Sequence, residues 1–207
     1  EIRLSLVGSE MCIRDSSMGA CTDLIYLAAR PYANGEVAFE LPLNDATMTN
    51  VSHTGTFQGR NGVVKFEGTS LMNGGDGLLH SADGAFNKFT FGTYIYISEW
   101  VDGAFLFKKM DGNSTIIAFQ MGATANSLKL SIGSSVATVT TPDLATGWHY
   151  IGLTYEQGTA KLYVDTNNTA INFVGALPNE IPNTRTDFLI GDKFKGYLDE
   201  TFVSSLV

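Results

Sequence analysis

The chain has 207 residues, of which 44% are hydrophobic and only 16% are charged, and its formal net charge is −8. This composition excludes a disordered chain, and no apolar stretch approaches the roughly 20 residues that a membrane-spanning helix needs. A nucleic-acid partner is also disfavoured, because it requires a basic surface and no basic run here is longer than Lys108–Lys109. An acidic surface suits neutral partners, sugars or cations better.

The first 35 residues are expected to form a tail outside the folded domain. Residues 3–16 resemble the peptide produced when a sequencing adapter is translated, a contaminant of metagenomic reading frames, so they are excluded from the fold prediction. The small residues just before Cys21 resemble the end of a bacterial lipoprotein signal, in which Cys21 would carry a lipid anchor. The alternative is an unmodified cysteine in a loose tail. No cysteine follows Cys21, which excludes a disulfide scaffold or a cysteine nucleophile in the main body.

From residue 36 onward, short segments of alternating hydrophobicity are separated by turns rich in Gly, Asn and Asp. Alternation with a period of two is typical of β-strands with one buried face. The expected strands are Val37–Leu41, Val63–Phe66, Phe89–Ile97, Phe105–Lys109, Ile116–Met121, Leu128–Ile132, Val136–Thr140, Trp148–Tyr155, Ala160–Val164, Ala170–Phe173, Phe188–Ile190 and Tyr197–Val203.

About a dozen strands at this spacing predict an all-β domain over residues 36–207, built as a two-sheet antiparallel sandwich or jelly roll. Two segments, Asn44–Gly62 and Met72–Gly84, are expected to be long connections. No long segment has apolar residues at the 3.6-residue spacing of an amphipathic helix, although Thr22–Arg30 could form one short helix.

Four segments resemble the laminin-G-like branch of the concanavalin A-like lectins and glucanases. A strand beginning with Trp leads through a glycine-containing turn into a strand ending in Leu-Tyr-Val-Asp, over Gly147–Asp165. Gly196–Val203 looks like the final strand of this family, Phe89–Ile95 like an early core strand, and Gly62–Gly68 like its second strand. The resemblance implies a concanavalin A-like jelly roll.

Catalysis is not expected. Glucanases of this family cleave glycosidic bonds with carboxylates in a Glu-x-Asp-x-x-Glu arrangement on one strand, and the sequence lacks this pattern. The nearest acidic couplet, Asp199–Glu200, is expected to point to opposite faces of a strand, where the two carboxylates could not act together. The three histidines have no nucleophile or metal motif around them.

Strand parity predicts a row of aromatic side chains on the outer face of one sheet, because the apolar residues of the same strands fill the core. Aromatic rings in such a position suit stacking on a pyranose ring. Trp100 is expected to be exposed in a loop and is a separate candidate. The alternative is that Trp148 is buried and that the tyrosines pack under loops or the N-terminal segment. The candidate carbohydrate-binding residues are Tyr94, Tyr96, Trp148, Tyr150, Tyr163 and Trp100.

Relatives of this kind often hold a structural Ca²⁺ with an Asp of the last strand and oxygens from the start of the domain, and Asp199 matches that position. Glu40, Asn44 and Asp45 could supply further hard oxygen ligands. The alternative for Asp199 is a carboxylate that accepts hydrogen bonds from backbone amides at the strand end. The glycine-rich loop Asn73–Gly77 is a rival oxygen-rich site.

These patterns predict an extracellular or surface-attached bacterial module that binds a glycan or polysaccharide without cleaving it, as part of a larger multidomain protein. The competing prediction is a structural or adhesion module whose partner is a protein or a neighbouring domain.

Overall fold

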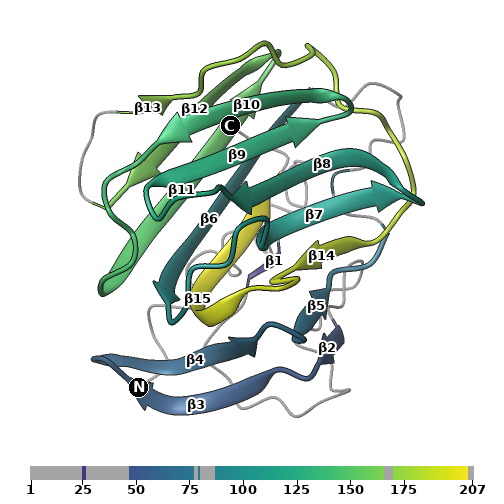
Figure 1. Cartoon of the computed structure of the whole chain (residues 1–207). Helices are drawn as coiled ribbons and strands as arrows, with labels where there is room; N and C mark the ends of the chain where they lie inside the picture. The colour runs from purple at the N-terminus through teal and green to yellow at the C-terminus, as the bar shows by residue number, and fades with distance from the viewer. Residues whose placement is uncertain (1–24, 27–46, 77–78, 80–86, 166–169, 205–207) are drawn as a thin grey trace, which may run out of the picture.

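The structure is a computed structural model, and it describes residues 25–26, 47–76, 79, 87–165 and 170–204. These residues form two antiparallel sheets packed face to face (Figure 1). The predicted all-β class and the two-sheet jelly-roll sandwich are therefore confirmed. The described residues contain no helix that is long and apolar enough to cross a membrane.

The first sheet has eight strands, and along its main path their order is β13–β12–β11–β6–β15–β4–β3. The short strand β1 lies off this path and pairs with the end of β15. The strands of this sheet are β1 (Ile25–Tyr26), β3 (Ser52–Phe57), β4 (Arg60–Glu67), β6 (Lys88–Ile97), β11 (Trp148–Glu156), β12 (Thr159–Val164), β13 (Ile171–Asn172) and β15 (Lys195–Ser204).

The second sheet has seven strands in the order β10–β9–β8–β7–β14–β5–β2, and it lies in front in Figure 1. Its strands are β2 (Thr47–Thr49), β5 (Leu71–Asn73), β7 (Phe105–Asp111), β8 (Ser114–Met121), β9 (Ser127–Ile132), β10 (Ser135–Thr140) and β14 (Phe188–Ile190). Strands close in sequence, such as β8, β9 and β10, pair as antiparallel neighbours through tight turns, as the glycine-punctuated sequence predicts.

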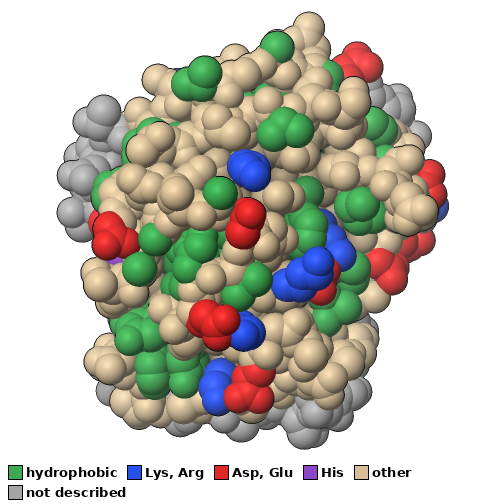
Figure 2. Space-filling model, in the orientation of Figure 1, with side chains coloured by type: hydrophobic (Ala, Val, Ile, Leu, Met, Phe, Trp, Pro, Cys, Tyr) green, Lys and Arg blue, Asp and Glu red, His purple; other side chains and the backbone are tan. Residues whose placement is uncertain are grey.

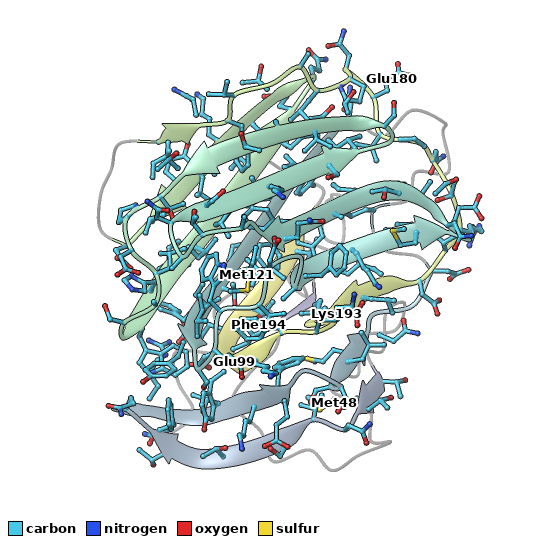
Figure 3. The ribbon with its side chains drawn as sticks, in the orientation of Figure 1. Met48, Glu99, Met121, Glu180, Lys193 and Phe194 are labelled. Atoms are coloured by element: carbon cyan, nitrogen blue, oxygen red, sulfur yellow. The ribbon has the colours of Figure 1, made fainter. Side chains whose placement is uncertain are left out.

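The core lies between the sheets and is filled by one parity of the strand residues from each. The ring centroid of Phe107 on β7 lies 4.9 Å from that of Phe91 on β6 and 5.8 Å from that of Phe119 on β8. Met121 and Phe194 also belong to this core (Figure 3). Because every second residue of a strand points into the core, the residues between them in the first sheet point outward.

The expected long connection Asn44–Gly62 is wrong, because it contains β2 and β3. Strand β3 pairs with β4 in a tight hairpin through Gln58 and Gly59, which have φ values of 47° and 83°. Two central residues with positive φ match the hairpin turns that follow the natural twist of the strands. Strand β3 is the last strand along the path of its sheet and has few apolar residues, so its hydrophobic alternation is weak.

The second expected connection, Met72–Gly84, is wrong at its start, which lies in β5. Within the expected tail, Ile25–Tyr26 is extended and pairs with Val203 and Phe202, so the short helix expected over Thr22–Arg30 is wrong there. The expected strand Val37–Leu41 lies outside the described residues.

The two outer faces of the sandwich differ in character. Figure 2 views the molecule from the side of the second sheet, where Lys and Arg side chains lie beside Asp and Glu side chains. Lys108 of β7 forms an ion pair with Asp192. The outer face of the first sheet instead gathers aromatic side chains from strands β3, β6, β11 and β15, and it is the face on which the candidate site lies.

Candidate functional site

The register of the first sheet brings the predicted aromatic residues together in two adjoining rows. Trp148 on β11 lies opposite Tyr96 on β6, and Tyr150 lies opposite Tyr94. On the other side of β6, Tyr197 of β15 lies opposite Tyr96. All five side chains are half-buried, and those on β6 and β15 alternate with core residues along their strands. Together with Phe57 of β3 they are called the aromatic face below.

The tip of the β3–β4 hairpin packs onto one end of the aromatic face. The ring of Phe57 stacks on Tyr197 with centroids 3.7 Å apart and planes 16° apart. It also makes an edge contact with Tyr96, with centroids 4.9 Å apart. Tyr96 contacts the Trp148 ring as well, at 5.7 Å. Tyr96 is therefore packed among other rings, which matches the alternative expectation that the tyrosines pack under another segment.

Arg60, the first residue of β4, reaches across β15 and lies over the aromatic face. Its guanidinium carbon is 3.7 Å from the centroid of the Tyr94 ring and 5.5 Å from that of Trp148. Its Nε donates a hydrogen bond to Oδ2 of Asp199 at 2.6 Å, and a second ion pair joins it to Glu200 at 3.4 Å. A cation that lies over an aromatic ring and is paired with carboxylates fixes the position of the ring as well as its own. One face of Tyr94 is thus already covered.

Between the hairpin tip and β11 the surface forms an open depression of about 440 Å³, within the size range of small-ligand sites. Aromatic rings form its apolar part, and an amide, a guanidinium and a carboxylate supply hydrogen-bonding groups. The residues that line it are Gln58, Gly59, Arg60, Tyr94, Trp148, Tyr150 and Asp165.

A second depression, of about 560 Å³, lies farther along β11 and β12 on the same face. Tyr163 contributes the aromatic ring here, and Lys161 and Glu156 contribute one charge of each sign. The aromatic side chain predicted on β12 is therefore placed on the same outer face as the others but in a separate depression.

Asp165 is held at the rim of the first depression by the first residues of β11. Its Oδ1 accepts a hydrogen bond from the backbone N–H of Tyr150 at 2.9 Å, and its Oδ2 lies 2.9 Å from Nδ1 of His149. The other ring nitrogen of His149 lies 2.9 Å from the carbonyl oxygen of Thr146. Asp165 has a φ of 55°, a backbone conformation that is uncommon for residues other than glycine. The side-chain contacts with His149 and Tyr150 hold it in this conformation.

Tyr150 is the ring most suited to meet a ligand in the first depression. Its hydroxyl is half-buried, and this burial raises its pKa, with further increases from the nearby Tyr94 and Glu200. A tyrosine hydroxyl is protonated at neutral pH even at its ordinary pKa of about 10, so it can both donate and accept a hydrogen bond. The ring centroids of Tyr150 and Tyr94 are 5.1 Å apart.

Trp148 has a buried indole N–H with no hydrogen-bond partner among the described residues. The residue as a whole is half-buried, so the alternative expectation of a fully buried Trp148 is not what the structure shows. Its ring reaches the wall of the first depression while its N–H faces away from solvent.

Trp100 lies in the loop between β6 and β7, as expected, but the expectation that it is exposed is wrong. Its side chain is half-buried against the hydrophobic core, and its indole N–H donates a hydrogen bond to the carbonyl oxygen of Gly122 at 2.8 Å. Trp100 therefore closes one end of the core, away from the residues that line either depression.

The expectation that Asp199 and Glu200 point to opposite faces is also wrong. The register between β15 and β6 shifts after Asp199, and Glu200 has a φ of 48°. Such a β-bulge redirects side chains, and both carboxylates contact Arg60. Oδ1 of Asp199 also accepts a hydrogen bond from the backbone N–H of Glu200 at 2.9 Å, as the alternative for Asp199 expected.

The calcium site stays a prediction. Both carboxylate oxygens of Asp199 are bonded to protein groups, so a cation there would have to displace Arg60. In the described part of the chain, no three acidic, His or Cys side chains lie close enough to share a metal ion. Outside the described residues lie Glu40, Asn44, Asp45 and the lipidation candidate Cys21.

Sequence reasoning missed several residues that shape this site, namely Phe57, Arg60, Asp165 and Tyr197. The available signal was the segment Phe-Gln-Gly-Arg, in which an aromatic and a cationic residue flank a two-residue turn ending in glycine. It went unused because β3 was not recognised as a strand.

A family model described as the concanavalin A-like lectin/glucanases superfamily, of laminin G type, matches residues 72–206, which is more than half of the chain. The chain belongs to this superfamily. The match confirms the resemblance stated from the sequence, and it lies within the expected domain 36–207. No curated protein matches the chain.

Several solved structures resemble the chain in fold. Domain 4 of AbnA, an extracellular arabinanase from Geobacillus stearothermophilus solved with arabinotriose, has a TM-score of 0.59 and 16% identity over 77% of this chain and 82% of that one. Trypanosoma rangeli sialidase gives 0.60 and 15%, covering 87% of this chain and 30% of that one. A structure of botulinum neurotoxin type C gives 0.64 and 14%, covering 88% and 48%. Identities this low describe the fold alone.

Proposed function

We propose that this protein is a non-catalytic carbohydrate-binding module and that it binds its glycan in the first depression of the aromatic face. The observation that supports this most directly is the composition of the depression, where Trp148 and Tyr150 adjoin the polar groups of Gln58, Arg60 and Asp165. A sugar presents an apolar C–H face together with hydroxyl groups, and this mixture of surfaces complements both.

The residues of the depression take different parts in the proposed complex. Tyr150 and Trp148 supply the surface on which the sugar ring stacks, while Arg60 keeps Tyr94 in place beneath it. Tyr163 in the second depression contacts a neighbouring sugar unit of the same glycan. Tyr96 acts indirectly, because it supports Trp148 from within the aromatic face.

The similar proteins support a glycan as the ligand class. The arabinanase domain was solved with arabinotriose, and cell entry of the neurotoxin depends on interaction with two ganglioside molecules. The arabinanase is extracellular, which supports an extracellular location for this module, tethered by a lipid on Cys21 and joined to other domains. Mass spectrometry of the protein purified from membranes tests the lipid: an unmodified Cys21 would contradict it.

A structural Ca²⁺ at Asp199 with Glu40, Asn44 and Asp45 is also part of the proposal, with Arg60 giving way to the ion. Thermal unfolding in the presence of EDTA, and again after Ca²⁺ is restored, tests it. A Tm that falls on chelation and recovers with Ca²⁺ supports the site, and a constant Tm contradicts it.

The test of glycan binding uses the two tryptophans of the chain. In a Trp100→Phe variant, Trp148 is the only indole, so its fluorescence reports directly on the first depression. Titration with soluble arabinan, xylan, β-glucan and mannan should give a saturable change for at least one of them. Tyr150→Ala should weaken that binding about tenfold or more.

The matched control is Phe105→Ala, which removes a half-buried aromatic side chain from the outer face of the other sheet. It should leave the affinity unchanged. If no polysaccharide binds in fluorescence or calorimetry, or if Tyr150→Ala binds as well as the parent protein, the proposal fails and the competing role in adhesion to a protein partner gains support.

A further inference from the structure

We infer that the first depression selects an uncharged glycan and discriminates against acidic sugars such as uronates and sialates. This inference rests on the proposed carbohydrate-binding function. It follows from the charges around the depression, where the one cation, Arg60, is paired with the carboxylates of Asp199 and Glu200. A third carboxylate, that of Asp165, lines the same depression.

The single cation is not available to a ligand carboxylate. Recognition of a carboxylate by arginine is strongest when two parallel N–H groups of the guanidinium bind its two oxygens. In this structure Nε of Arg60 is already bonded to Asp199 at 2.6 Å, and one terminal nitrogen is paired with Glu200 at 3.4 Å. The guanidinium carbon also lies over the Tyr94 ring, 3.7 Å from its centroid. What remains are N–H donors suited to single hydrogen bonds with hydroxyl groups.

The carboxylates, in contrast, leave an excess of negative charge at the rim. Asp199 is neutralised by Arg60, but Glu200 is 51% exposed, and Asp165 is 41% exposed where it lines the depression. The one ionic neighbour of the Asp165 carboxylate among the described residues is His149, which is charged only when protonated. A bound anionic sugar would therefore meet repulsion across a short distance.

The other groups around the ligand are those that neutral hydroxyls use. The hydroxyl of Tyr150, which lines the depression, can donate and accept a hydrogen bond, and the exposed Gln58 offers an amide donor and acceptor. The second depression carries Glu156 and Lys161, whose charges cancel. The formal charge of the whole chain, −8, adds a long-range field of the same sign as the rim.

The test compares neutral and acidic probes by Trp148 fluorescence in the Trp100→Phe background. Neutral probes are arabinan, xylan, β-glucan and mannan; acidic probes are polygalacturonate, alginate and sialyllactose. We expect the best neutral probe to bind at least about tenfold more tightly than every acidic probe at low salt. Added salt should leave neutral binding unchanged, because that binding involves no charge on the ligand.

Charge-removing variants then locate the discrimination. Glu200→Gln should raise the affinity for acidic probes relative to neutral ones by about threefold or more, because it removes one rim charge. Glu99→Gln is the control, since Glu99 is exposed and pairs with Lys195 away from the depression; it should leave the ratio unchanged.

The outcomes separate this inference from the proposed function. If an acidic probe binds as tightly as the best neutral probe, or if Glu200→Gln and Glu99→Gln change the ratio equally, the inference is overturned while glycan binding stands. If neither class of probe binds, the proposed function itself is refuted.

Discussion

Removing the guanidinium of Arg60 should destabilise the domain as well as disturb the depression. In Arg60→Ala, the Asp199 carboxylate would lose its charged partner while only 7% of it is exposed to solvent. A buried charge left without its partner typically costs about 3–5 kcal/mol, and the contact with the Tyr94 ring adds about 0.5–1 kcal/mol. Arg60 is itself 24% exposed, so solvent screens part of the pair and water can reach the carboxylate in the variant. We therefore expect a loss of about 2–3 kcal/mol.

Urea unfolding followed by circular dichroism measures this loss. With a slope of about 2 kcal/mol per molar urea, the midpoint should fall by about 1–1.5 M. The matched control is Glu99→Ala, which breaks the ion pair with Lys195, whose side chains are 62% and 39% exposed. An exposed pair of this kind should contribute less than about 0.5 kcal/mol.

A double-mutant cycle with Asp199→Ala assigns the loss to the pair itself. Arg60→Ala should cost much less in the Asp199→Ala background, because no buried charge then remains to be left unpaired. A loss below about 0.5 kcal/mol for Arg60→Ala in the parent protein, or equal losses in both backgrounds, would refute the claim that this ion pair anchors the hairpin on the sheet.

Three further predictions concern backbone packing and pH. Gly196→Ala should lower the free energy of unfolding in urea by about 3 kcal/mol or more, because the added Cβ would overlap the carbonyl oxygen of Tyr96. The control is Gly133→Ala, where φ is 58° and no atom lies nearby; it should lower the free energy of unfolding by only about 1–2 kcal/mol. Because the pKa of Tyr150 is raised in the folded protein, the unfolded chain loses this proton first as pH rises. The free energy of unfolding should therefore fall above about pH 10, and it should fall less steeply in Tyr150→Phe. An equal dependence of the unfolding free energy on pH in the two proteins would contradict this. Gly152→Ala would place a Cβ 3.1 Å from the Tyr150 ring, and should weaken glycan binding about threefold or more while unfolding free energy changes by less than about 1 kcal/mol; unchanged affinity would contradict a positioning role.

The sheet architecture could be predicted from the sequence because the central strands carry strong alternation. In β6 and β11, apolar side chains such as Phe91 and Leu153 face the core at every second position, and the aromatic residues between them face outward. Successive side chains of an extended strand point to opposite faces, so the buried and exposed positions can be predicted from each strand alone. Strands β2, β3 and β5 were not predicted. Strands β2 and β3 are edge strands with few apolar residues, and β2 and β5 have only three residues each, too few to show a clear alternation.

What the sequence could not provide were the contacts between distant segments. Arg60 and Asp199 are 139 residues apart, and they meet only because β15 lies between β4 and β6 in the sheet. The bulge after Asp199, which turns Glu200 toward the same guanidinium, has no side-chain pattern that marks it. Trp100 was misplaced for the same reason, since its partner Gly122 belongs to the far end of another hairpin.

The glycines of the central strands show how the sheet itself prepares the depression. Gly92 and Gly152 lie directly opposite each other on β6 and β11, on the outer face. A Cβ on Gly92 would overlap the ring of Phe202 and lie 2.9 Å from the Tyr150 hydroxyl. The paired glycines therefore leave a strip of bare backbone on which the rings of Tyr150 and Phe202 lie. Because Tyr150 rests on this strip, its ring stays in place without a ligand, and binding need not first order a mobile side chain.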